Sequence, residues 1–267
     1  MNKVWIASFP RSGNTFIRNV LFHVYGIDSL EFEKHLATRK NINFIKTHYL
    51  PFELSTYDRK KDKVVYLVRD GRDSICSLAY KRKIMIDTDS DLNHNFHEAI
   101  QAERGSFFGG WGINILFWLK ENPIIIRFED LIENPRKVFE EKLEKQLNLP
   151  KANWDELPTF TKQKSGLSRF GNIKMENVED FPNLFFRKGQ IGNWKYEMDV
   201  DHQKMFNEKY LRYLHAFGYD IEGNINTIQP DKLDKIKKDN LSRISFRYKK
   251  NLWDLKDKIK TKIKNGI

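Results

Sequence analysis

The N-terminal part of this chain contains the segment Val4-Trp5-Ile6-Ala7-Ser8-Phe9-Pro10-Arg11-Ser12-Gly13-Asn14-Thr15-Phe16. The β-branched and aromatic content of Val4–Phe9 predicts a strand, and the apolar periodicity of Thr15–Tyr25 predicts a helix. A strand, a tight glycine-containing turn and a helix present backbone N–H groups and a positive helix end to an anion such as phosphate. A plain strand–turn–helix connection explains the segment equally well. The segment alone therefore leaves both interpretations open.

Strand and helix patterns alternate through the rest of the chain. Three further strands are predicted, at Asn43–Thr47, Lys63–Arg69 and Ile124–Phe128. Further helices are predicted at Asp73–Lys83, Phe107–Lys120, Pro135–Leu147 and Asp201–Phe217, and the polar stretch Asp87–His97 is predicted to be a loop. This alternation predicts an α/β fold with a central, mainly parallel sheet flanked by helices. Such sheets bind ligands beyond the carboxyl ends of their strands.

The charge of the chain is unevenly distributed. Of 267 residues, 47 are Lys or Arg and 36 are Asp or Glu, which gives a formal net charge of +11. Residues 231–267 carry 13 basic and 5 acidic residues, a net charge of +8, so the remainder of the chain is close to neutral. The single cysteine, Cys76, excludes an internal disulfide. No apolar run reaches the roughly 20 residues of a membrane-spanning helix. We therefore expect a cytoplasmic protein with a domain over 1–225 and a basic, helical extension over 226–267.

Two other segments carry cations suited to an anionic ligand. Arg69 ends a predicted strand at the ligand-binding edge, and Ser77 lies about one turn inside the helix that follows. In the second segment, Arg187 and Lys188 precede Gly189, and another glycine follows three residues later. A salt bridge at the end of a strand and a solvated basic loop are the simpler explanations of these two segments. Neither segment decides the ligand by itself.

One histidine is a candidate general base. His48 follows the predicted strand Asn43–Thr47, and its ordinary pKa of about 6.5 suits a general base near neutral pH. Lys46 lies two residues earlier and points to the same side of the strand. By contrast, His94 and His97 have a metal-like spacing but no completing carboxylate or cysteine, so we predict that they lie on the surface.

Five motifs in this order resemble the cytosolic-type sulfotransferase family, whose donor is 3′-phosphoadenylyl sulfate (PAPS). Ser8–Phe16 is similar to the family's 5′-phosphosulfate loop, and Lys46-Thr47-His48 is similar to its catalytic Lys-Thr-His. Arg69–Ser77 is similar to its 3′-phosphate segment, and Arg187–Lys195 to its Arg-Lys-Gly loop. Phe128–Pro135 falls where the family has a Tyr-Glu-Asp segment and a following Asn-Pro. The resemblance implies a P-loop-like, three-layer fold.

The resemblance also implies roles for individual residues. His48 would be the base, and Lys46 and Arg11 would stabilise developing negative charge. PAPS and its product adenosine 3′,5′-bisphosphate (PAP) would be bound, with no metal, by Arg11, Ser12, Gly13, Asn14, Thr15, Phe16, Arg69, Ser77, Phe128, Arg187, Lys188 and Gly189. A carboxylate such as Glu129 is the alternative base.

The chain departs from the family pattern at three positions. Arg11 stands where many cytosolic members have Lys, so it keeps the charge but cannot transfer a proton. Phe16 replaces the usual Trp that faces adenine, and Asn193 replaces a common Asp. An arginine at the first position is familiar in carbohydrate-directed relatives. We therefore expect a hydroxyl or amine acceptor, with a carbohydrate or glycolipid favoured.

Two other functions stay open on the sequence. A P-loop kinase of a small molecule or nucleoside would need a Walker lysine and Mg²⁺ ligands, and G-x-x-x-x-G-K-[ST] is absent. A polyanion-binding protein would act through the basic tail, although we do not expect nucleic acid as a partner. The apolar stripe and lysines of residues 231–267 also fit peripheral contact with an anionic membrane. The oligomeric state cannot be predicted.

Overall fold

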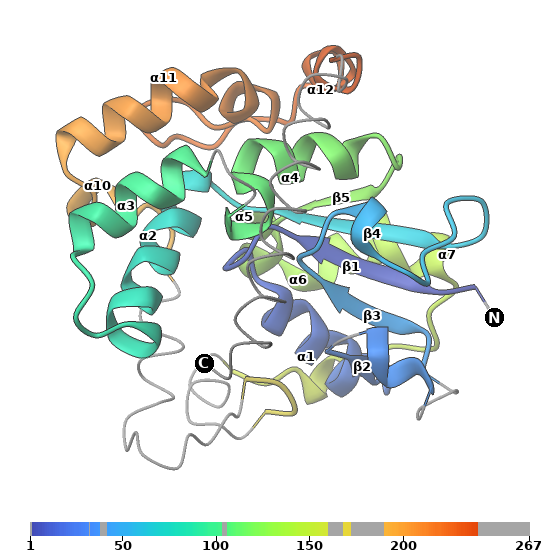
Figure 1. Ribbon diagram of the computed structural model, residues 1–267. Coiled ribbons are helices and arrows are strands. Elements are labelled where there is room, and N and C mark those ends of the chain that lie inside the picture. The colour runs from blue at the N-terminus through green and yellow to red at the C-terminus, as the bar shows by residue number, and fades with distance from the viewer. Residues whose placement is uncertain are drawn as a thin grey trace.

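The computed structural model describes residues 2–31, 33–37, 42–102, 106–159, 168–171 and 190–239. A five-stranded sheet in the order β2-β3-β1-β4-β5 forms the centre (Figure 1). Its strands are β1 (Val4–Ser8), β2 (Ser29–Leu30), β3 (Phe44–Thr47), β4 (Lys63–Val68) and β5 (Ile124–Arg127). Every neighbouring pair is parallel, so the carboxyl ends of all five strands lie at one edge.

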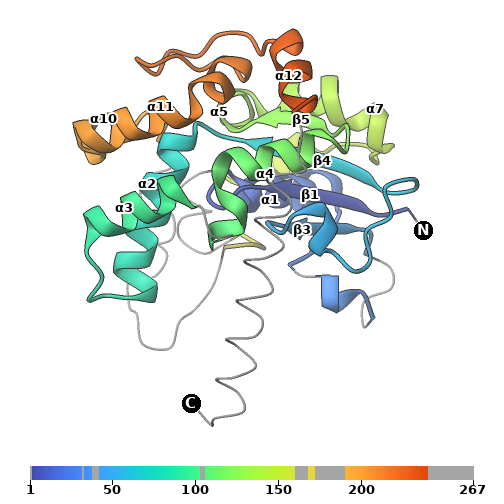
Figure 2. The ribbon, with the colours of Figure 1, turned by 45° about the horizontal axis from the view of Figure 1, so that its top comes forward.

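Helices cover both faces of the sheet, as the alternating pattern predicted. Helix α1 (Asn14–Tyr25) lies on one side and helices α4 (Gly110–Leu119) and α11 (Val200–Ala216) on the other (Figures 1 and 2). The remaining helices are α2 (Gly71–Lys81), α3 (Leu92–Gln101), α5 (Phe128–Glu133), α6 (Pro135–Val138), α7 (Glu144–Leu147), α10 (Trp194–Glu197) and α12 (Pro230–Lys237). Short 3₁₀ turns lie at Glu33–Ala37, Pro51–Glu53, Ser106–Gly109 and Trp154–Glu156, and π-helical turns lie at Arg82–Ile86 and Phe139–Leu143.

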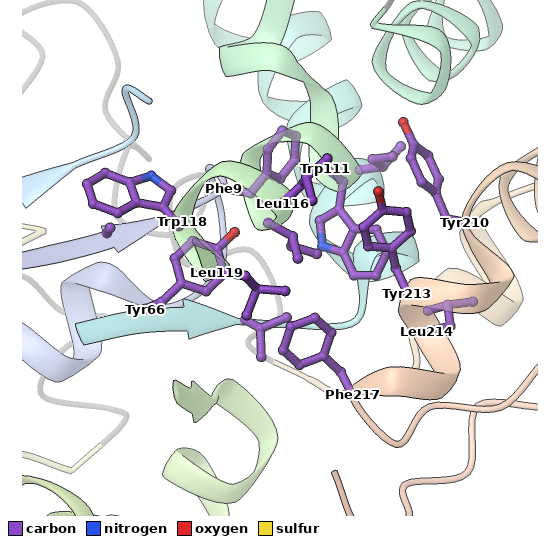
Figure 3. Packing of buried hydrophobic residues seen from close by; sticks show 14 of the residues in the cluster. Phe9, Tyr66, Trp111, Leu116, Trp118, Leu119, Tyr210, Tyr213, Leu214 and Phe217 are labelled. Atoms are coloured by element: carbon purple, nitrogen blue, oxygen red, sulfur yellow. The ribbon is translucent and has the colours of Figure 1, made fainter. Parts of the chain in front are cut away.

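The alternation of side chains along β1 divides the core into two clusters. Trp5 and Ala7 face the cluster under α4 and α11, whereas Val4 and Ile6 face the cluster under α1. Figure 3 shows the first cluster, in which Trp111 of α4 packs beside Tyr210 and Tyr213 of α11. A strand buried on both faces explains why β1 and β4 are apolar almost throughout. This packing holds the carboxyl ends of the central strands in place.

Helix α3 and strand β2 differ most from what the sequence predicted, and the short helices α5 and α10 were not predicted either. The stretch Asp87–His97 is not all loop, because α3 begins at Leu92, where Asp91 caps the helix by accepting a hydrogen bond from His94 N at 2.7 Å. Phe96, Ala99 and Ile100 bury one face of this helix, and the polar residues between them hid that periodicity. The second difference is β2, whose two residues are too few to show any period. His94 and His97 are exposed, as predicted.

The predicted C-terminal extension begins with α12, which packs against the body. Leu233 and Ile236 of α12 are buried, and Lys120 Nζ donates to Asp239 O at 2.9 Å. Residues 240–267, which include most of the basic tail, lie outside the described residues. No helix in the described part of the chain is long and apolar enough to cross a membrane.

Candidate active site

The loop after β1 reaches the sheet edge and turns into α1 at Gly13. Gly13 adopts φ +99°, a conformation that residues with a Cβ rarely adopt. A Cβ at this position would lie only 2.4 Å from Cδ2 of Phe128, the first residue of α5. The glycine therefore lets the backbone turn and lets the Phe128 ring lie directly against the loop.

Arg11 joins this loop to α2. Its Nε donates to Ser77 Oγ at 2.9 Å, and its backbone has φ +69°. Nη1 of Arg69, just after β4, donates to Arg11 O at 3.2 Å. The structure thus brings together the loop, the end of β4 and the first turns of α2, as expected for strands whose carboxyl ends share one edge.

Arg69 is held by aromatic and polar neighbours. Its guanidinium lies 4.6 Å from the centre of the Phe128 ring, and its Nη2 donates to Gln190 O at 2.9 Å. Nη2 also lies 3.6 Å from Asp73 Oδ2. Only 9% of Arg69 is exposed. Since stacking and two acceptors constrain the planar group, its orientation is largely set before any ligand binds.

Asp73 anchors the segment that follows the predicted Arg-Lys-Gly loop. Its carboxylate accepts hydrogen bonds from Gly192 N at 2.8 Å and Trp194 N at 3.0 Å. Burial raises the pKa of Asp73, while these donors and Arg69 act in the opposite direction. Arg187, Lys188 and Gly189 themselves lie outside the described residues, so their predicted position in the site is untested.

His48 follows β3, and its neighbours fix its tautomer. Nδ1 lies 2.9 Å from Ser8 O and 3.3 Å from Ser8 Oγ. Because a carbonyl oxygen can only accept, Nδ1 carries the proton and Nε2 keeps a lone pair. Asn14 Nδ2 in turn donates to Ser8 Oγ at 2.6 Å. Burial, together with the charge of Lys46, lowers the pKa of His48 to about 3. The imidazole is therefore neutral near pH 7 and has the form of a proton acceptor.

Lys46 forms an ion pair that the sequence did not predict. Its ammonium contacts Glu31, whose other carboxylate oxygen lies 2.5 Å from Arg18 Nη1. The register of β2 and β3 pairs Leu30 with Ile45, which places Glu31 beside Lys46. The two cations lower the pKa of Glu31 to about 2, against the effect of its burial. Lys46 is thus held near His48 by a shared carboxylate.

Several buried polar atoms lie around the loop. Ser12 Oγ, Asn14 Oδ1 and Arg69 Nε are buried without a hydrogen bond to any described residue. Thr15 lies in the first turn of α1, and Phe16 is partly buried against the apolar cluster under that helix. Buried polar atoms without partners are costly unless a ligand or water satisfies them. Of these atoms, Ser12 Oγ and Arg69 Nε can donate hydrogen bonds to a bound anion.

Glu129, the alternative base, lies in a different environment. Its carboxylate accepts from Tyr219 OH at 2.6 Å and from Asp70 N at 3.1 Å, and the residue is 2% exposed. Burial raises the pKa of Glu129 to about 7. Both oxygens are thus engaged in joining α5 to the start of α2 and to Tyr219. This arrangement favours a structural role over proton transfer to a substrate.

Sequence reasoning missed a further cation at the site. Lys81 is four residues after Ser77 on α2, so the two side chains lie on the same face of the helix. Electrostatic interaction links it to Arg11, Lys46 and His48. The i, i+4 spacing from Ser77 was the available signal. For Glu31 no such signal existed, because β2 is invisible in the sequence pattern.

The family model for the sulfotransferase domain matches residues 1–218. The chain belongs to this family. Its curated relatives include mouse sulfotransferase 1 family member D1, which is 25% identical over 244 residues, covering 78% of this chain and 82% of the relative. Dog sulfotransferase 1A1 is 24% identical over 248 residues, with 80% and 83% covered. The predicted enzyme class, a sulfotransferase, is therefore confirmed.

Solved structures agree with the fold of this sulfotransferase. Mouse sulfotransferase SULT7A1 complexed with PAP gives a TM-score of 0.62 at 18% identity, with 80% of this chain and 84% of that chain covered. Retinol dehydratase in a complex with retinol and PAP gives 0.58 at 17% identity, with 79% and 81% covered. The predicted α/β fold with a mainly parallel sheet is confirmed. Among the described residues, no group of His, Cys, Asp and Glu could hold a metal ion.

Proposed function

We propose that this sulfotransferase moves the sulfuryl group of PAPS directly to an acceptor hydroxyl or amine and releases PAP, with His48 as the base. The observation that carries the proposal is the Arg11–Ser77 hydrogen bond of 2.9 Å, which joins the two segments predicted to bind the anionic ends of PAPS. Similarity to two proteins whose crystal structures contain PAP supports the choice of donor.

The residues at the loop suit a nucleotide with two anionic ends. Ser12 Oγ and the first N–H groups of α1 would bind the 5′-phosphate, since the helix end attracts negative charge. Arg69 and Ser77 would bind the 3′-phosphate, and Nε of Arg69, which has no hydrogen bond to the described part of the chain, is a donor for it. Arg187, Lys188 and Gly189 are proposed for the same phosphate, and Phe16 and Phe128 for the adenosine. Recognition of the 3′-phosphate would distinguish PAPS from ATP.

In the proposed reaction, Nε2 of His48 accepts the proton of the acceptor hydroxyl as the new O–S bond forms. The S–O bond to the 5′-phosphate breaks, and Arg11 stabilises the negative charge that develops there. Lys46 stabilises charge on the transferred group. Such transfers depend on in-line positioning and charge neutralisation more than on covalent chemistry by the protein.

Substitution of His48 tests the base. His48→Ala is expected to reduce turnover by about 10²–10⁴-fold, while the dissociation constant for PAP changes little. The exposed His94 supplies a matched control, and His94→Ala should leave both quantities unchanged. Radiolabelled PAPS and calorimetric titration with PAP give the two measurements. Full activity of His48→Ala would overturn the assignment of the base.

A nucleotide comparison separates sulfuryl transfer from kinase activity. We expect PAP to raise the unfolding temperature of the full chain more than ATP with Mg²⁺ does, because Arg69 and Ser77 have no 3′-phosphate to bind in ATP. The reverse order would favour the kinase.

The class of acceptor and the role of the tail belong to the same proposal. Arg11 in the loop favours a carbohydrate or glycolipid hydroxyl, and an acceptor panel with radiolabelled PAPS tests this. Contact of residues 231–267 with an anionic membrane surface is proposed from their net charge of +8. Co-sedimentation of the full and truncated chains with phosphatidylserine vesicles measures that contact. Failure of the full chain to sediment would refute the contact.

A further inference from the structure

Lys81 is a partly buried cation that the proposed donor site does not use. It is the last residue of α2, and among the described residues it has no ion pair and no side-chain hydrogen bond. The other cations of the site have oxygen partners: Arg11 contacts Ser77, Lys46 contacts Glu31 and Arg69 contacts Asp73. A half-buried ammonium without a counter-charge is unfavourable unless a ligand supplies one.

The charges around Lys81 make an ammonium at this position still less favourable. Burial and the nearby charges of Arg11 and Lys46 all lower the pKa of Lys81. Glu31 acts in the opposite direction, but its carboxylate already pairs with Lys46 and Arg18. An anionic ligand close to Lys81 would therefore meet an unneutralised positive charge.

The position of Lys81 points to the acceptor rather than to the nucleotide. Arg69 precedes α2 and Ser77 lies in its second turn, whereas Lys81 lies four residues beyond Ser77, about 6 Å further along the helix axis and away from Arg69. Lys81 also interacts electrostatically with His48, the residue that would face the acceptor. Arg69, which is proposed for the 3′-phosphate of the donor, lies at the opposite end of the helix.

Aromatic side chains line the same region beside His48. The ring of Phe108 lies 5.6 Å from the His48 ring and 5.3 Å from the Tyr49 ring, measured between centres. Tyr49 is 49% exposed. Flat aromatic faces of this kind pack against planar rings and against the apolar faces of sugars. The surroundings of His48 thus include flat aromatic rings as well as the charge of Lys81, which has no ion pair among the described residues.

We propose that Lys81 selects acceptors that carry a carboxylate or another anionic group near the reacting hydroxyl, an inference that rests on the proposed sulfuryl transfer. Such an acceptor would lie against Tyr49 and Phe108, with its anionic group at the Lys81 ammonium.

Matched pairs of acceptors test the proposal. We would compare 4-hydroxybenzoate with its methyl ester, and methyl galacturonoside with its methyl ester, because each pair differs in charge at a single group. Initial rates with radiolabelled PAPS give the acid-to-ester ratio of kcat/KM. We expect the acid to be preferred in at least one pair. Lys81→Gln should lower that ratio about tenfold, Lys81→Glu should reverse the preference, and Lys81→Arg should retain it.

A neighbouring lysine controls for net charge. Lys83 donates to Thr88 O at 2.7 Å near the surface, and Lys83→Gln should leave the acid-to-ester ratio unchanged. Equal use of acid and ester by the unsubstituted chain, or use of neither, overturns the proposal. A loss of PAP affinity in Lys81→Gln as large as the loss of acid preference would assign Lys81 to the donor and also overturn it. Failure of the unsubstituted chain to bind PAP would instead refute the proposed function.

Discussion

Substitution of Gly13 by alanine tests whether the loop, Phe128 and Arg69 act as one unit. The new Cβ would lie 2.4 Å from Cδ2 and 2.8 Å from Cε2 of Phe128, well inside ordinary contact distance. The ring must therefore move, and the Arg69 guanidinium, 4.6 Å from the ring centre, loses its stacking surface. We expect Gly13→Ala to weaken PAP binding at least tenfold, because Arg69 is one of the proposed 3′-phosphate ligands.

Gly13→Ala should lower the stability of the fold for two reasons, and the matched substitution at Gly26 distinguishes them. Alanine in a left-handed conformation costs about 1–2 kcal/mol, and crowding in a packed site costs about 1–3 kcal/mol more. Gly26 has φ +67°, and a Cβ added there would have no atom within 4 Å, so Gly26→Ala should show the backbone cost alone. At about 3 °C per kcal/mol for a domain of this size, the unfolding temperature should fall by about 3–6 °C in Gly26→Ala and about 6–15 °C in Gly13→Ala.

Differential scanning calorimetry and titration with PAP measure both effects on the two variants. Gly26→Ala should keep the PAP affinity of the unsubstituted chain, since Gly26 lies at the far end of α1. Equal losses of stability in the two variants would show that the crowding against Phe128 is relieved without cost. Unchanged PAP affinity in Gly13→Ala would refute the coupling of Phe128 to Arg69.

Three other predictions concern titrating groups. Because the pKa of His48 is lowered to about 3, kcat/KM for PAPS should show no break near pH 6.5, and a break there would contradict a neutral His48. Glu31→Gln should destabilise the fold by about 1–2 kcal/mol, because Lys46 loses its carboxylate partner, yet it should tighten PAP binding, because a negative charge is removed. Denaturant unfolding measures the stability and titration with PAP measures the affinity. Weaker PAP binding would contradict the prediction. The pKa of Glu129 is about 7 in the folded state against an ordinary value of 4.5, so the folded state binds a proton more tightly than the unfolded state does. The free energy of unfolding should therefore fall by about 3 kcal/mol as the pH rises from 4.5 to 7. Glu129→Gln should flatten this pH dependence in urea unfolding, and an unchanged dependence would refute it.

Much of the fold was predictable because the pattern of each element survives in the sequence. Four of the five strands end within one or two residues of the predicted bounds, since a strand buried on both faces is continuously apolar. By contrast, β2 has only two residues, and α3 has polar residues around its buried face. In both cases tertiary packing determines an element that local periodicity cannot reveal.

The same distinction holds for the candidate site. Arg11, Ser77 and Arg69 could be expected to meet, because each follows a strand whose carboxyl end lies at one edge. The partner of Lys46 could not be predicted, because Glu31 reaches it only through the register of β2 on β3. Contacts that depend on the order of the strands could therefore be predicted from the sequence, whereas contacts that depend on the register between strands could not.

This difference explains why the sequence indicates the donor more readily than the acceptor. The proposed donor residues follow strand ends or begin helices, and the parallel sheet brings such positions to one edge whatever the rest of the chain does. The proposed acceptor side consists of Lys81 at the end of α2, Phe108 and Tyr49, which share no sequence motif. The specificity for the acceptor must then be inferred from the charges of the side chains at this side. Since Lys81 is the cation of the site without an oxygen partner among the described residues, the acceptor's charge is the property that the proposed role of Lys81 predicts most directly.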